Sequence, residues 1–131
     1  MVGVDTNVLL RFFVIDDEAQ HKAVVRRFSK MEKAGEKAFV SSVVIAELVW
    51  GLRSIYGYSR SQIANVVEAI LEGALFEVDG RSVLSSAVKA YRSGGPDLAD
   101  LLILELALDR GARALLTFDA KLRKRSDCES P

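Results

Sequence analysis

Short apolar runs alternate with longer segments of helical periodicity along almost the whole 131-residue chain. The short runs are rich in β-branched residues and apolar on both faces, which is typical of strands buried in a parallel sheet. We expect four such strands, at residues 2–4, 38–41, 75–78 and 114–117, with residues 2–4 as a central strand. Parallel strands joined by helices form right-handed βαβ units, so the pattern predicts an α/β fold with helices covering both faces of the sheet.

Helical periodicity covers six segments, at residues 8–14, 18–34, 43–55, 60–72, 81–93 and 98–110. Ser59 followed by Gln62 is typical of a capping box, and Gly94, Gly95 and Gly111 stand where helices are expected to end. The sequence contains no internal repeat and no linker rich in proline or glycine. At this length we expect residues 1–131 to form a single domain.

Composition disfavours several classes of protein. The 18 Lys and Arg residues balance the 18 Asp and Glu residues and half of the chain is apolar, which disfavours a disordered chain and a strongly basic nucleic-acid binder. One cysteine, Cys128, cannot build a disulfide framework or a thiolate metal cluster. The longest apolar stretch contains Asp100 and Glu105, so we expect no membrane span. No basic-then-apolar leader precedes Val2, which predicts a cytoplasmic protein.

Four carboxylates stand in positions that are unusual for solvated acids. Asp5 directly follows the first expected strand, and Asp119 follows the last one. Glu47 interrupts an otherwise uncharged stretch, and Asp100 interrupts a leucine-rich one. Sites of open α/β sheets form at the carboxyl ends of the strands, so we expect these four side chains to point to the same edge.

Glu47 has the most apolar surroundings of the four. Val43 lies one helical turn before it and Trp50 one turn after it, so we expect its side chain to be buried. A buried charge without compensation costs several kcal/mol. The compensation is either a metal site or a buried arginine such as Arg11 or Arg53.

A cluster of carboxylates favours cation binding. Two carboxylates about 5 Å apart repel each other by about 3 kcal/mol at an effective dielectric constant of about 20. Oxygen ligands without histidine or cysteine select a hard divalent ion, Mg²⁺ or Mn²⁺. His21 lies on a polar stretch and the chain has no glycine-rich phosphate-binding motif, so neither a catalytic triad nor a nucleotide cofactor is indicated. Water activated by the metal is then the natural nucleophile, as in phosphodiester cleavage.

Simpler explanations exist for each acid. Asp5 and Asp119 could cap helices, Asp100 could cap its own helix or pair with a basic residue, and Asp97 is interpreted mainly as an N-cap. A phosphatase with Asp5 as its nucleophile is a second enzyme class, but it requires another acid where the chain has Asn7. A non-catalytic binding module is a third hypothesis, and it would be favoured by the loss of one of the four acids.

Residues 4–9 (VDTNVL), 41–50 (SSVVIAELVW), 97–103 (DLADLLI) and 115–119 (LLTFD) stand in an order and spacing that resemble the PIN-domain ribonucleases. Within that family they are most similar to VapC-type toxins of toxin–antitoxin pairs. The resemblance implies a three-layer α/β/α PIN-like domain with a central parallel sheet of four or five strands. The fifth strand of many family members falls where this chain has the charged segment 121–131.

The resemblance also implies an activity, that of a Mg²⁺-dependent endoribonuclease, with Mn²⁺ as a second usable ion. Its acidic site would consist of Asp5, Glu47, Asp100 and Asp119, with Asp5 and Asp100 as the direct metal ligands. Polar supports would be Thr6, Asn7 and Thr117, and Asp97 would be accessory.

The partners implied by the resemblance are an RNA substrate, a cognate small antitoxin whose tail covers the site, and a second copy in a homodimer. The apolar segments 9–14 and 43–55 could dock the antitoxin or could be core. Basic groups that could hold RNA phosphates are Arg11, Lys121, Arg123, Lys124 and Arg125, although the last four could equally be a solvated tail. A nuclease of RNA maturation remains an alternative to a toxin.

Overall fold

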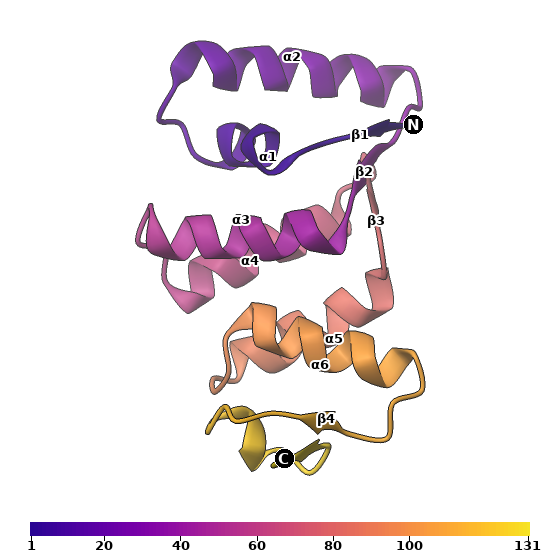
Figure 1. Cartoon of the computed structure of the whole chain (residues 1–131). Helices are drawn as coiled ribbons and strands as arrows, with labels where there is room; N and C mark the ends of the chain where they lie inside the picture. Colours follow the sequence, from indigo (N-terminus) through magenta and orange to yellow (C-terminus); the bar gives the residue numbers. More distant parts are fainter. The chain divides into compact units, whose positions relative to one another are not determined.

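A computed structural model describes all residues, 1–131, and the chain forms two compact units, Met1–Asp79 and Gly80–Pro131. The elements of the first unit are β1 (Val2–Gly3), α1 (Thr6–Phe13), α2 (Glu18–Lys33), β2 (Ala38–Val40), α3 (Ser42–Ser54), α4 (Arg60–Glu72) and β3 (Phe76–Val78) (Figure 1). Those of the second unit are α5 (Arg81–Arg92), α6 (Leu98–Asp109), β4 (Leu115–Leu116), the 3₁₀ helix η1 (Leu122–Lys124) and β5 (Cys128–Glu129).

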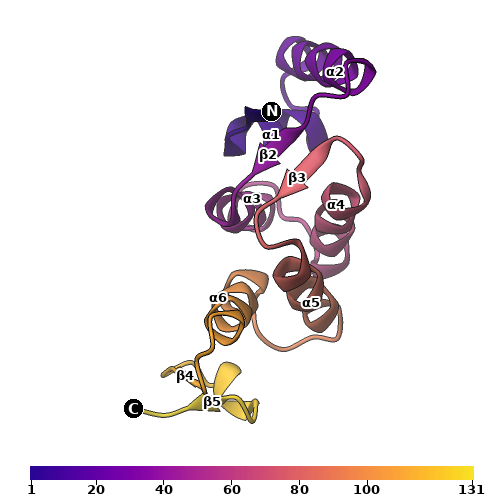
Figure 2. The same cartoon turned by 90° about the vertical axis from the view of Figure 1, so that its right-hand side faces the viewer.

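The strands of the first unit form a parallel sheet in the order β1-β2-β3, which confirms the predicted α/β class. Val2 lies opposite Ala38 and Phe39 lies opposite Glu77, and Figure 2 shows β2 and β3 side by side. Four or five strands with residues 2–4 in the centre were expected, whereas the sheet of the first unit has three strands and β1 lies at its end. Hydrophobic periodicity indicates which runs are extended, whereas the neighbours of a strand depend on pairing between distant segments.

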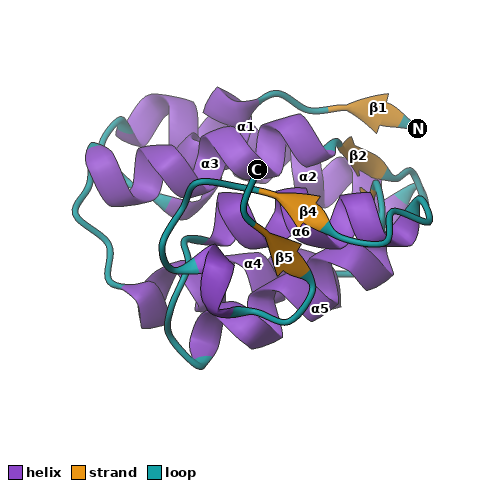
Figure 3. Ribbon diagram, turned by 60° about the horizontal axis from the view of Figure 1, so that its bottom comes forward, coloured by secondary structure: helices purple, strands orange, loops and turns teal.

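The second unit contains a helical pair followed by two short strands. α5 and α6 pack against each other, and the turn between them passes through Gly94 and Gly95, whose φ angles of 100° and 86° lie in the left-handed region. β4 pairs in parallel with β5, with Leu115 opposite Cys128 (Figure 3). A fifth strand therefore forms, and it comes from the charged C-terminal segment.

The helix boundaries lie within two residues of the predicted ones, and side chains cap the starts of four of the six helices. Ser59 Oγ accepts a hydrogen bond from the Gln62 backbone N–H at 3.1 Å, and Gln62 Oε1 accepts one from the Ser59 N–H at 2.8 Å. This pair is the predicted capping box, and α4 occupies the predicted residues 60–72. Asp17 caps α2 by accepting from the Gln20 backbone N–H, and Ser41 caps α3 by accepting from the Val44 N–H, without the reciprocal bond of a capping box.

Each unit has a core of aliphatic and aromatic side chains, and no charged residue is buried. In the first unit Phe12, Phe28 and Phe76 form an aromatic cluster with ring centroids 5.0 to 6.4 Å apart. In the second unit the buried residues of α5 and α6 include Leu84, Tyr91 and Leu101. None of the helices has the length and apolar character needed to cross a bilayer.

Candidate active site

Glu47 is exposed on α3, so the prediction that its charge is buried is wrong. Val43 and Trp50, which share its side of the helix, are 69% and 58% exposed. α3 instead buries a different side, formed by Ile45, Leu48, Val49 and Leu52. The helix is apolar almost all round, and such a sequence does not show which side faces the core. Water therefore solvates the carboxylate, and its charge needs no buried partner.

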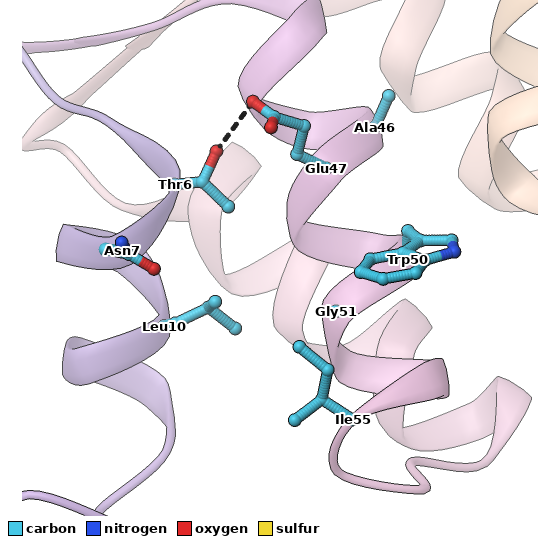
Figure 4. Close-up of a pocket in the computed structure, with 8 residues that line it drawn as sticks. All are labelled: Thr6, Asn7, Leu10, Ala46, Glu47, Trp50, Gly51 and Ile55. Carbon is cyan, nitrogen blue, oxygen red and sulfur yellow. Dashed lines mark hydrogen bonds between the residues drawn. The ribbon is translucent and has the colours of Figure 1, made fainter.

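Thr6 orients the Glu47 carboxylate. Thr6 is the first residue of α1, and its hydroxyl donates a hydrogen bond to Glu47 Oε1 at 3.0 Å (Figure 4). α1 and α3 pack against each other, so the bond joins the start of one helix to the middle of its neighbour. This contact brings together a predicted catalytic residue and a predicted supporting residue.

Asp5 lies beside this pair in the chain and caps α1. Its Oδ1 accepts a hydrogen bond from the Val8 backbone N–H at 3.1 Å, and its own backbone is extended. The capping explanation of Asp5 is thus confirmed as a local contact. Because the cap employs Oδ1, the carboxylate is held in a fixed orientation at the start of α1.

A pocket of about 450 Å³ lies between α1 and α3. Figure 4 shows its lining residues, which are Thr6, Asn7, Leu10, Ala46, Glu47, Trp50, Gly51 and Ile55. Gly51 was not predicted as a site residue, and Leu10 and Ile55 were predicted only as parts of longer apolar segments. Residues 47, 50, 51 and 55 follow one side of a helix, and that spacing was the available signal.

The Glu47 carboxylate contacts Thr6 and neither Arg11 nor Arg53, so the explanation by a buried arginine is wrong. The Arg11 guanidinium donates to Asp16 Oδ1 at 3.1 Å and to Gln20 Oε1 at 2.6 Å. The Tyr56 hydroxyl donates to Asp16 Oδ2 at 2.5 Å. The Tyr56 hydrogen bond and the Arg11 charge lower the pKa of Asp16, and the Asp16 carboxylate raises the pKa of Tyr56. Arg11 therefore links α1 to the start of α2 and, through Tyr56, to the segment that follows α3.

The second unit places Asp97 and Asp100 at the start of α6. Asp100 lies in the first turn of the helix and is half-buried. Asp97 occupies the N-cap position, as predicted, but its side chain makes no capping hydrogen bond. Both carboxylates lie at the end of the helix dipole that favours negative charge.

Asp119 and Thr117 form a tight turn after β4. The Asp119 backbone N–H donates to Thr117 Oγ1 at 3.0 Å. Asp119 Oδ1 accepts from the backbone N–H groups of Lys121 and Leu122 at 2.9 and 2.8 Å. Asp119 thus binds the backbone of the turn that leads into η1, whereas the N-cap position of η1 is occupied by Lys121.

Two of the four basic residues in and beside η1 have partners in the protein. Arg125 pairs with Asp127 at 3.3 Å, and Arg123 donates to Ser130 Oγ at 3.3 Å. Lys121 and Lys124 are exposed. The tail therefore presents two solvated lysine side chains close in the chain to Asp119.

The candidate acidic residues have the right donor chemistry for a hard divalent cation, because all of them offer carboxylate oxygens. Neither unit by itself brings three Asp, Glu, His or Cys side chains together to hold a metal ion. Asp5 and Glu47 belong to the first unit, and Asp100 and Asp119 belong to the second.

Comparisons with known proteins agree on one family. The model of the PIN domain family matches residues 2–127. A VapC ribonuclease of Aquifex aeolicus (strain VF5) is 32% identical over 121 residues, which cover 92% of this chain and 89% of that protein. No solved structure matches the chain significantly. The matched residues include parts of both units.

Proposed function

This chain belongs to the PIN domain family, and on that premise we propose that it is a divalent-metal-dependent endoribonuclease and the toxin of a toxin–antitoxin pair. The observation that carries the proposal is the similarity to a VapC ribonuclease over 92% of the chain. A similarity that extends over 89% of the relative is evidence about the whole protein rather than about one motif. We further propose that residues 1–131 act as one PIN domain, which the family match over residues 2–127 supports.

The catalytic residues that we propose are Asp5, Glu47, Asp100 and Asp119, with Asp5 and Asp100 as ligands of Mg²⁺ or Mn²⁺. The support is their oxygen-only donor chemistry and their place in the sequence motifs of the family. A bound Mg²⁺ or Mn²⁺ supplies activation of water for attack on the phosphodiester and neutralises the leaving oxygen.

The chain's own residues orient the acids for this reaction. The Thr6 hydroxyl fixes one oxygen of Glu47, and the α1 cap fixes Asp5. Asn7 lies on the pocket wall, where its amide can donate to a substrate phosphate. Thr117 and Asp97 are supporting residues near Asp119 and Asp100 respectively.

The partners that we propose are an RNA substrate, a small antitoxin and a second copy of the chain. The exposed apolar side chains Trp50, Ile55 and Val43 support a protein partner near Glu47, since this side of α3 is not core. In segment 9–14, Leu9 and Leu10 are buried, whereas residues 11–14 are half-buried, so only part of this segment belongs to the core. We propose a cytoplasmic location, where the RNA substrate is found.

Two other functions are distinguished by the same assay. A nuclease of RNA maturation would cleave one precursor RNA and would not arrest growth when expressed alone. A non-catalytic PIN-like module would bind RNA without cleaving it. Neither is favoured by a specific contact in the structure.

The test is cleavage of a panel of single-stranded and hairpin RNAs with Mg²⁺, with Mn²⁺ and with EDTA. We expect cleavage that requires the metal and is abolished by Glu47→Gln, which retains the shape of the side chain. The matched control is Glu77→Gln, since Glu77 is another exposed acid of the first unit. Cleavage that persists in EDTA, or an equal loss in both variants, would overturn the proposal.

A further inference from the structure

Helix α2 carries an uneven share of the chain's positive charge. Its 16 residues contain five Lys and Arg and two Asp and Glu, whereas the whole chain has a net charge of zero. Four of these cations, Lys22, Arg26, Lys30 and Lys33, are spaced by four, four and three residues. We call these four residues the basic stripe.

The basic stripe lies along one side of the helix. At 100° per residue its members fall within an arc of about 80°, and they extend about 16 Å along the axis. All four are exposed. The buried residues of α2 are Phe28 and Met31, which lie on the other side of the helix. The stripe therefore faces solvent, away from the packing side of α2.

Little in the fold neutralises these charges. Lys22 pairs with Glu18 at 3.2 Å, and both side chains are more than half exposed. No acidic side chain lies within 4 Å of the charged groups of Arg26, Lys30 or Lys33. Arg27, which lies off the stripe, takes Glu36 as its partner at 3.9 Å. Three adjacent cations are thus without a counter-charge in the protein.

The surface beside the stripe is open. A hollow of about 460 Å³ is lined by Glu18, Ala19, Lys22 and Arg26. Ala19 and Ala23 lie on the same side of the helix as the stripe, and their small side chains leave room between the long cationic ones. A row of cations on a surface without large apolar side chains fits a polyanion chain better than an apolar partner.

We propose that the basic stripe binds the sugar–phosphate backbone of an RNA, through up to four phosphates outside the segment that is cut. The inference rests on the proposed ribonuclease function, which makes RNA the polyanion that this protein meets. Contacts of this kind hold and orient the substrate and carry no sequence information. They add affinity for long RNAs and take no part in the cleavage reaction, which the proposed acidic residues carry out.

The test compares a variant in which Lys22, Arg26, Lys30 and Lys33 are all replaced by Gln with a charge-preserving control, Lys22→Arg, Arg26→Lys, Lys30→Arg and Lys33→Arg. Both sets are placed in a Glu47→Gln background, and binding of a twenty-nucleotide single-stranded RNA is measured at several salt concentrations. Each lost phosphate contact reduces the salt slope by about 0.7 for a single strand. We expect the Gln variant to reduce the slope by about 3 and to weaken binding at least tenfold, and the control to keep both.

The outcomes separate this inference from the proposed function. The nuclease activity itself is measured by cleavage of a four-nucleotide RNA in proteins that retain Glu47. The stripe substitutions should reduce the rate of this cleavage much less than the rate for the twenty-nucleotide RNA. Parental affinity and slope in the Gln variant would overturn the inference while leaving the nuclease intact. If the Gln variant loses antitoxin binding but binds RNA as the parent does, the inference is also overturned, because the basic stripe would then bind an acidic protein. If the fourfold variant does not fold, the double variant Arg26→Gln, Lys30→Gln gives the same test with an expected slope change of about 1.4.

Discussion

The Thr6 hydroxyl lies 3.0 Å from Glu47 Oε1 and donates a hydrogen bond to it, although the two residues are 41 positions apart in the chain. The bond connects the first turn of α1, which Asp5 caps, to the exposed side of α3. A carboxylate on a solvated helix surface would otherwise sample several rotamers. One hydroxyl therefore restricts the orientation of the acid that we place in the catalytic site.

Replacing Thr6 by Val tests this restriction, because it removes the hydroxyl and keeps the side-chain volume. We expect a loss of stability below about 1 kcal/mol, since Glu47 is exposed and water can replace the bond. RNA cleavage should fall about tenfold, which corresponds to about 1.4 kcal/mol of activation free energy. Thr6→Ser retains the hydroxyl and should cleave at close to the parental rate. Equal rates for the two variants would show that the hydrogen bond does not contribute.

Gly51 offers a stabilising substitution at the wall of the pocket. It lies inside α3, and a Cβ built there would meet Leu10 Cδ1 at 3.6 Å, an ordinary van der Waals contact. Ala costs less conformational entropy than Gly in a helix, so Gly51→Ala should raise the free energy of unfolding by about 0.5–1 kcal/mol. Urea denaturation measures the change.

Gly73→Ala is the contrasting variant, since a Cβ there would lie 3.0 Å from Phe76 Cδ2 and 3.1 Å from the Ala69 carbonyl oxygen. We expect it to lower the free energy of unfolding by about 1–3 kcal/mol, because the chain must shift to accept the methyl group. A lower free energy of unfolding for Gly51→Ala would contradict the prediction, because the added methyl group would then clash with Leu10 rather than contact it.

Local features of the fold were predicted more fully from the sequence than the order of the strands in the sheet. Residues 60–72 were predicted as a helix and form α4, because Ser59 and Gln62 satisfy the first backbone N–H groups by contacts within one turn. The pairing of β1 depends instead on segments far along the chain, and its position at the end of a three-stranded sheet was not predicted.

Glu47 shows why the candidate site was only partly predictable. The sequence around it is apolar on both sides of α3, so periodicity could not tell the buried side, which includes Leu48, from the exposed side, which includes Trp50. The contacts of Arg11 were missed for a related reason. Asp16 is near Arg11 in the chain, but Tyr56 reaches both only after α3 has folded beside α1.

The lowered pKa of Asp16 predicts how the free energy of unfolding changes at acidic pH. The Tyr56 hydrogen bond is the largest cause that lowers this pKa below its ordinary value of 3.8. A lowered pKa means that the folded state favours the charged carboxylate, so its contribution is fully present above pH 3.8 and is lost as the pH falls below that value. Asp16→Asn should therefore be less stable than the parent at pH 7, with a difference that shrinks below pH 3.8.

An NMR titration checks the cause directly. In Tyr56→Phe the pKa of Asp16 should rise towards 3.8, because the largest favourable hydrogen bond is gone. For the stability of Asp16→Asn described above, the matched control is Asp79→Asn, because Asp79 is another exposed acid of the first unit. A pKa of Asp16 that does not change in Tyr56→Phe would assign the shift to Arg11 instead.

Metal binding should be visible as stability before any cleavage is measured. A ligand that binds only the folded state at a hundred times its Kd stabilises it by about 2.7 kcal/mol. Mg²⁺ or Mn²⁺ should therefore raise the Tm of the parent, and should raise that of Asp100→Asn much less. Without metal, Asp100→Asn should change the free energy of unfolding by no more than about 1 kcal/mol, because the relieved repulsion from Asp97 opposes the lost interaction with the dipole of α6. Equal metal stabilisation of both proteins would exclude Asp100 as a ligand.

We propose that Asp5, Glu47, Asp100 and Asp119 are each required for metal-dependent cleavage of RNA. The most direct measurement is the rate of RNA cleavage with saturating Mg²⁺ by Asp5→Asn, Glu47→Gln, Asp100→Asn and Asp119→Asn, each confirmed to be folded by its circular dichroism spectrum. We predict that each single substitution lowers the rate by a factor of about 100 or more, while Glu77→Gln cleaves like the parent. A parental rate in any of the four variants would contradict the proposal, because that acid would then take no part in the reaction.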